Sequence, residues 1–99
     1  MTTEKIEVLL DIYDKIESTE GPGVVVTIGT GTNFFSTGFD LQYWAASNAN
    51  AIQSIAKIQI LYAKVLSLGL PSMAVFNGHA MAGGLILGLA HDFRIMTNN

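Results

Sequence analysis

Two glycine-bearing segments combine residue types that favour the stabilisation of a negatively charged oxygen. The first runs from Phe34 to Leu41 and the second from Asn77 to Gly84, and each follows an apolar, β-rich run. Each segment turns at a glycine and opens toward a helix, where unpaired backbone N–H groups gather and attract negative charge. The two segments together therefore predict an oxyanion hole.

The predicted donors are the backbone N–H groups of Phe39 and Gly83. Gly38 allows the chain to bend so that the N–H of Phe39 points into a pocket, and Gly83 has no side chain to keep a carbonyl oxygen away from a backbone N–H. A side chain at position 83 would occupy the place of the substrate. Each glycine taken alone is also typical of an ordinary turn or helix contact, but the presence of both segments favours the two-amide site.

Other chemical interpretations of the sequence are weaker. No Gly-x-x-x-x-Gly-Lys-Ser/Thr phosphate loop is present, and the run from Gly29 to Phe34 lacks the third glycine of a dinucleotide-binding fingerprint. His79 and His91 are candidate acid/base groups, but we expect a structural role for His79 and no proton relay between His91 and the adjacent Asp92. Asp40 follows the glycine of the first segment and is expected to cap the helix toward which that segment opens.

The elements that must position these segments indicate an α/β fold with a mostly parallel sheet. We expect helices over residues 3–18, 51–67 and 83–90, and strands over residues 24–28, 72–76 and 92–96. The continuous β-branched run at 24–28 predicts a strand buried on both faces. Residues 47–50 are expected to form a polar hinge, and helix 51–67, apolar on most of its circumference, is expected to be buried or to lie at a subunit contact.

The composition limits the classes of protein. The 99 residues allow one domain at most, and 49% apolar against 13% charged residues suggest that other protein covers part of the surface. A net charge of −3 with five scattered basic residues argues against nucleic-acid binding, and no apolar run reaches the length of a membrane span. The absence of cysteine excludes disulfides and thiolate metal sites, and we expect no metal site.

Residues 35–41, 71–84 and 90–95 resemble the crotonase (enoyl-CoA hydratase/isomerase) superfamily, and within it most closely the enoyl-CoA isomerases that move a double bond from the 3 to the 2 position. The resemblance covers residues 1–99, which would form the central portion of a single crotonase-like domain. It implies a ββα superhelix, incomplete in these 99 residues, that usually forms trimers or packs in a larger complex. It also implies binding of an acyl-CoA thioester, with coenzyme A as part of the substrate and no permanently bound cofactor.

Matched residue by residue, the resemblance assigns the thioester oxygen to the N–H groups of Phe39 and Gly83. The backbone around Ser36, Gly38 and Asp40 would help form the adenine end of the coenzyme A pocket. The enolate would be the intermediate stabilised by the two N–H groups.

Two departures from the family pattern refine the expected reaction. Ile86 stands where hydratases carry a catalytic glutamate, which disfavours water addition and suits an isomerase with a single general base. That base is expected beyond Asn99, so the oxyanion hole is present here without it. The resemblance thus implies an enzyme of fatty-acid β-oxidation in the mitochondrion or peroxisome, and the alternative is a catalytically inactive, structural subunit of a larger assembly.

Overall fold

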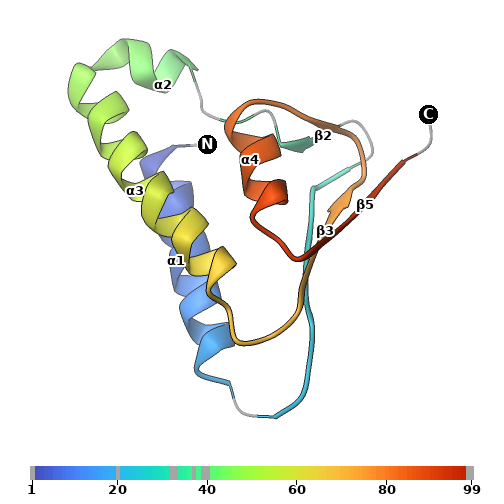
Figure 1. Ribbon diagram of the computed structural model, residues 1–99. Helices are drawn as coiled ribbons and strands as arrows, with labels where there is room; N and C mark the ends of the chain where they lie inside the picture. Colours follow the sequence, from blue (N-terminus) through green and yellow to red (C-terminus); the bar gives the residue numbers. More distant parts are fainter. Residues whose placement is uncertain (1, 20, 32–33, 37, 39–40, 98–99) are drawn as a thin grey trace.

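The computed structural model describes residues 2–19, 21–31, 34–36, 38 and 41–97. Helices and strands are interspersed along the chain, as expected for an α/β fold (Figure 1). In chain order the elements are α1 (Thr3–Glu17), β1 (Val25–Ile28), β2 (Phe34–Ser36), α2 (Leu41–Ala46), α3 (Asn48–Leu66), β3 (Ser72–Phe76), β4 (His79–Ala80), α4 (Gly83–Leu89) and β5 (Phe93–Met96).

Parallel pairing of the strands brings the two glycine segments together. The main sheet has the order β1-β3-β5, and both of its strand pairs are parallel. Parallel strands end at the same edge of a sheet, so the segments that follow β1 and β3 leave from neighbouring points. They then form a second parallel pair, β2 with β4, in which Ser36 lies opposite Ala80. The sheet topology therefore explains why segments more than forty positions apart in the sequence meet.

Helices α1 and α3 run side by side in the same direction along one side of the main sheet (Figure 1). Ion pairs between the helices join Glu7 to Lys57, and Asp14 and Glu17 to Lys64, at 2.7 and 3.0 Å for the latter two. Exposed pairs of this kind contribute little stability. The apolar contact beneath them does more, because it removes large side chains from water.

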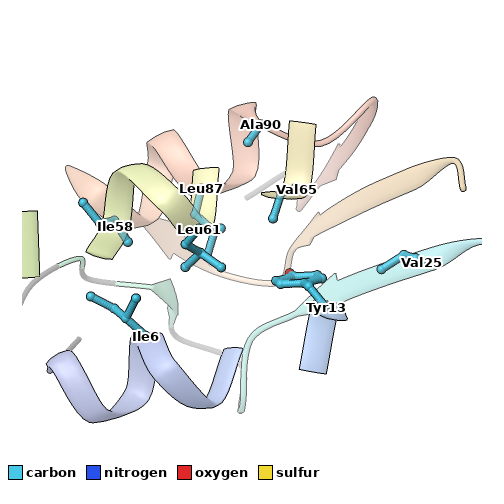
Figure 2. Close-up of a cluster of buried hydrophobic side chains, with 8 residues drawn as sticks. All are labelled: Ile6, Tyr13, Val25, Ile58, Leu61, Val65, Leu87 and Ala90. Atoms are coloured by element: carbon cyan, nitrogen blue, oxygen red, sulfur yellow. The ribbon is translucent and has the colours of Figure 1, made fainter. Parts of the chain in front are cut away.

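The main hydrophobic core lies where α1 and α3 meet β1 and α4. Its side chains repeat at helical spacing on the two long helices and are almost completely buried (Figure 2). The members of this cluster are Ile6, Tyr13, Val25, Ile58, Leu61, Val65, Leu87 and Ala90. The core therefore fixes α4, which begins at Gly83, against the rest of the chain.

The prediction that strand 24–28 is buried on both faces is wrong. Val25 faces the helices and is buried, whereas Val26 and Ile28 point to the opposite face and are more than half exposed. The register places Phe93 and Ile95 of β5 on this same face, and both are also more than half exposed. β-branched residues favour strands whether one face or two are covered, so residue type alone did not distinguish the cases.

The polar stretch at 47–50 is the start of a helix rather than a hinge. Ser47 caps α3, its side-chain oxygen accepting a hydrogen bond from the N–H of Ala49 at 3.1 Å, and α3 begins at Asn48. A short helix, α2, precedes it. Burial of α3 is confirmed for one face only, since Ile52 and Leu66 on its outer face are more than half exposed.

Candidate active site

Gly38 and Gly83 lie in direct contact at the junction of the two glycine segments. A Cβ atom built on Gly38 would lie 3.1 Å from the backbone nitrogen of Gly83 and 3.1 Å from the carbonyl oxygen of Met81. Gly38 also has a φ of +85°, which side-chain-bearing residues rarely adopt. A glycine at position 38 therefore leaves the N–H of Gly83 uncovered.

Ser36 joins the two segments on the other side of this contact. Its carbonyl oxygen accepts a hydrogen bond from the N–H of Met81 at 2.9 Å, and its hydroxyl oxygen accepts one from the N–H of Gly38 at 3.1 Å. A Cβ atom on Gly84 would lie within 2.5 to 2.7 Å of the Cβ, hydroxyl and carbonyl oxygens of Ser36. The close approach of α4 to β2 therefore requires glycine at position 84.

The chain enters α4 through a tight turn with unusual backbone geometry. The N–H of Gly84 donates to the carbonyl of Met81 at 2.9 Å, and Ala82 between them has φ 47° and ψ −121°. These angles are close to the mirror image of the first central position of a type II turn, where glycine is the usual residue. Ala82 is thus held in a strained conformation of the kind that is found at functional sites.

The N–H of Gly83 stands at the first position of α4. Ala82 before it supplies no side-chain cap. Within the described part of the chain, the N–H of Gly83 donates to no acceptor. An unpaired N–H at a helix N-terminus attracts a partial negative charge, so this group is suited to bind a carbonyl oxygen.

Asn77 holds the first segment in place, a role that the sequence did not predict. Its side-chain oxygen accepts from the N–H of Gly29 at 2.9 Å, and its side-chain amide donates to the carbonyls of Gly29 at 3.1 Å and Gly31 at 2.6 Å. One side chain thus satisfies three backbone groups of the loop after β1. An asparagine directly after a strand and before glycine was the available signal.

The predicted site residues fall into two groups. Ser36, Gly38 and Gly83 lie together as described, whereas Phe39 and Asp40 lie outside the described residues.

A cavity of about 390 Å³ lies beside Ser36, between α1, the end of β1 and α4, and neither Gly38 nor Gly83 lines it. Over the described ranges, no cluster of three or more His, Asp or Glu side chains is suited to hold a metal ion.

His91 belongs to a buried hydrogen-bond chain rather than to this site. Its Nδ1 lies 2.9 Å from the carbonyl oxygen of Leu87, which only accepts, so Nδ1 carries the hydrogen. Nε2 of the neutral ring then accepts from the Thr27 hydroxyl at 2.7 Å, and Thr27 in turn accepts from the Tyr13 hydroxyl at 2.7 Å. The adjacent Asp92 instead accepts from the N–H of Ser72 at 2.9 Å, so the two side chains form no relay.

The stability of the protein is expected to fall as the pH drops through the range where His91 gains a proton. Burial lowers the pKa of His91 below its ordinary value, and this outweighs the opposing effects of the Leu87 and Gly88 carbonyls and of Asp92. Arg94 acts in the same direction as burial. The unfolded chain therefore binds the proton first, so stability is complete above about pH 6.5 and declines below it, by at most about 1.4 kcal/mol per pH unit.

Urea unfolding at a series of pH values measures this slope. His91→Asn is expected to be less stable at pH 7 and to lose the part of the slope that begins near pH 6.5. His79→Asn makes the same change at an exposed position and serves as the control for the substitution itself. Equal slopes in the parent protein and His91→Asn would show that protonation of His91 does not cause the loss of stability at low pH.

Comparison with known proteins places this arrangement in a class. Residues 1–99 match the family model described as enoyl-CoA hydratase/isomerase. The chain belongs to this family. None of the helices over the described residues has both the length and the apolar character needed to cross a membrane.

Individual relatives carry several reaction names. The chain is 40% identical over 86 residues to enoyl-CoA delta isomerase 3 of Arabidopsis thaliana, a match that covers 83% of the chain and 35% of the relative. It is 34% identical over 100 residues to the peroxisomal enoyl-CoA delta isomerase 2 of the same plant, covering 94% and 41%. It is also 34% identical over 98 residues to 4-chlorobenzoyl coenzyme A dehalogenase-1 of an Arthrobacter species, covering 94% and 35%.

A solved structure confirms the crotonase-type α/β fold. The chain superimposes on the crystal structure of enoyl-CoA hydratase from Bacillus anthracis with a TM-score of 0.85 and 34% sequence identity, covering 92% of this chain and 36% of the other. The chain therefore spans less than half the length of these relatives.

Proposed function

We propose that the protein binds an acyl-CoA thioester and isomerises 3-enoyl-CoA to 2-enoyl-CoA, a reaction of fatty-acid β-oxidation. The observation that carries this proposal is the N–H of Gly83, which begins a helix and lies against Gly38. We assign the second donor to the N–H of Phe39, which follows Gly38 in the sequence. The thioester oxygen would accept hydrogen bonds from both groups.

The two N–H groups would act mainly in the transition state. Removal of a proton from C2 of the substrate places negative charge on the thioester oxygen, and donors already aimed at that oxygen stabilise the enolate without reorganising. Each donor contributes about 3 to 4 kcal/mol by comparison with deletions in other oxyanion holes. Return of the proton to C4 moves the double bond from C3–C4 to C2–C3 and leaves the atoms of the substrate unchanged in number.

Isomerisation suits the residues of the site better than hydration or dehalogenation. Isomerisation needs one general base, which we place outside the described residues, whereas water addition by two carboxylates needs an acid near α4 as well. Ile86, at the relevant position of α4, is half exposed and carries no titratable group. The names of the two plant relatives support the same choice.

Calorimetric titration of the purified protein with a saturated acyl-CoA, together with an assay on 3-enoyl-CoA, tests the proposal. We expect binding of the ester, turnover to the 2-enoyl product, and a lowered stretching frequency of the bound thioester carbonyl. Free coenzyme A serves as the control, since it has the nucleotide but no carbonyl. Absence of both binding and turnover would refute the proposal and favour the alternative of an inactive structural subunit.

The surroundings of the coenzyme A moiety are part of the same proposal. We assign the adenine end of the ligand to the backbone around Ser36, Gly38 and Asp40. We further propose a trimeric protein, because the open face of the main sheet and the outer face of α3 expose apolar side chains. Light scattering on the calorimetry sample measures its mass, and a monomer would contradict this part. A peroxisomal location is proposed from the name of the second plant relative.

A further inference from the structure

Tyr62 reaches from α3 to the first turn of α4. Its hydroxyl donates a hydrogen bond to the carbonyl oxygen of Gly83 at 2.9 Å. The ring packs against the main core cluster, so its position is set by the contact between α1 and α3. Tyr62 is therefore a rigid link between the longest helix of the chain and the residue that carries the proposed oxyanion donor.

The backbone of the first turn of α4 is held by hydrogen bonds from the N–H groups of Gly84 and Leu85 to the carbonyl of Met81 and from the N–H of Ile86 to the carbonyl of Ala82. No side chain caps it, and it opens with Gly83 and Gly84, the residue type that has the greatest backbone freedom. α4 has seven residues, and the carbonyl of Gly83 is the first carbonyl of the helix available to accept a hydrogen bond within it. A donor that arrives from another helix at this carbonyl limits rotation about the backbone bonds of Gly83.

We propose that Tyr62 is a positioning residue, whose hydroxyl holds Gly83 so that its N–H points at the thioester oxygen. This inference rests on the proposed function. The hydroxyl touches neither the substrate nor the reacting atoms in this assignment. It acts through the backbone of Gly83, together with the hydrogen bond from Gly84 N–H to Met81 on the neighbouring side of the turn.

The chemistry of the tyrosine suits this role. Burial raises the pKa of Tyr62 above its ordinary value, so the hydroxyl keeps its proton and remains a donor over the whole working pH range. A phenylalanine fills the same space without the donor. Tyr62→Phe therefore removes the hydrogen bond and leaves the packing against the core intact.

The experiment compares Tyr62→Phe with the parent protein in three measurements. We expect kcat on 3-enoyl-CoA to fall about three- to tenfold, the effect of losing one hydrogen bond that acts in the transition state, with KM changed less than twofold. The carbonyl stretching frequency of a bound acyl-CoA is expected to move back toward that of the free ester. Hydrogen exchange at the Gly84 N–H of the unliganded protein is expected to accelerate.

Tyr13→Phe is the matched control. It removes a hydroxyl of the same kind, which bonds to Thr27 at 2.7 Å and not to the first turn of α4. We expect a loss of stability in this variant, with kcat, carbonyl frequency and exchange at Gly84 unchanged.

The outcomes separate the two proposals. If the parent protein is active and Tyr62→Phe matches it in kcat and in carbonyl frequency, the positioning role is wrong while the proposed function stands. If the parent protein neither binds nor converts the ester, the proposed function fails and the catalytic part of this inference fails with it. In that case, exchange at the Gly84 N–H that is faster in Tyr62→Phe but not in Tyr13→Phe would still show that the Tyr62 hydroxyl restrains the turn.

Discussion

Alanine at position 84 is expected to destabilise the protein by about 1 to 3 kcal/mol or more and to displace α4 from β2. The new Cβ would lie 2.5 Å from the Cβ and hydroxyl oxygen of Ser36 and 2.7 Å from its carbonyl oxygen. These are backbone and near-backbone atoms, so they cannot move aside as the tip of a long side chain would. Alanine gains about 1 kcal/mol in helix propensity over glycine, which is too little to offset the clash.

Urea unfolding of the variant measures the loss, and Gly69→Ala is the matched control. Position 69 has no heavy atom within 4 Å of a built Cβ, so the same substitution there is expected to leave stability unchanged or slightly raised. Carbonyl polarisation of a bound acyl-CoA should also be lost in Gly84→Ala, since the turn that carries Gly83 moves with α4. A Gly84→Ala protein as stable as the parent would show that β2 and α4 are not in the close contact described.

Proline at position 83 is expected to lower kcat by about a hundred- to a thousandfold, the range found when one oxyanion donor is removed. Proline has no N–H, and the first position of a helix is the one where it is best tolerated. Gly83→Ala separates the loss of the donor from the added bulk, because alanine and proline both bring a Cβ. Alanine keeps the N–H and should act mainly by hindering substrate binding.

The two variants at position 83 are compared by kcat, KM and far-ultraviolet circular dichroism. We expect a raised KM for Gly83→Ala, and for Gly83→Pro a much lower kcat in a protein that still folds. Equal kcat values in the two variants would remove Gly83 N–H from the mechanism. If Gly83→Pro does not fold, the cause would be the strained backbone of Ala82, the residue before the proline. The double variant Ala82→Gly/Gly83→Pro would then restore folding and allow the same comparison.

Much of the arrangement around the site was predictable from local sequence. Gly38 and Gly83 each follow a predicted strand, and parallel strands bring their following segments to one edge, so their meeting follows from the order of the elements. The packing of α4 also requires glycine at position 88, since a Cβ there would lie 2.2 Å from the ring of Phe76. The resemblance to the enoyl-CoA hydratase/isomerase family was based on the same two segments. The match to the family model confirms that resemblance.

The features that sequence did not predict depend on neighbours that are distant in the chain. The exposure of Val26 depends on whether anything covers that face, which β-propensity does not encode. The positive φ of Ala82 occurs in the turn between β4 and α4, and alanine gives no local signal for it. The link from Tyr62 to Gly83 crosses between two helices, and a tyrosine within an apolar helix is more often only part of the core.

The three hydrogen bonds of Asn77 also bear on how the molecule ages. Asparagine is a thermolabile residue, and a following glycine leaves its side chain open to attack by the next backbone nitrogen. Deamidation would replace the donating NH₂ by an accepting oxygen, set against the carbonyls of Gly29 and Gly31. Hydrolysis at this one side chain would therefore release the loop after β1, and the same hydrogen bonds, while intact, slow that damage by holding the amide in place.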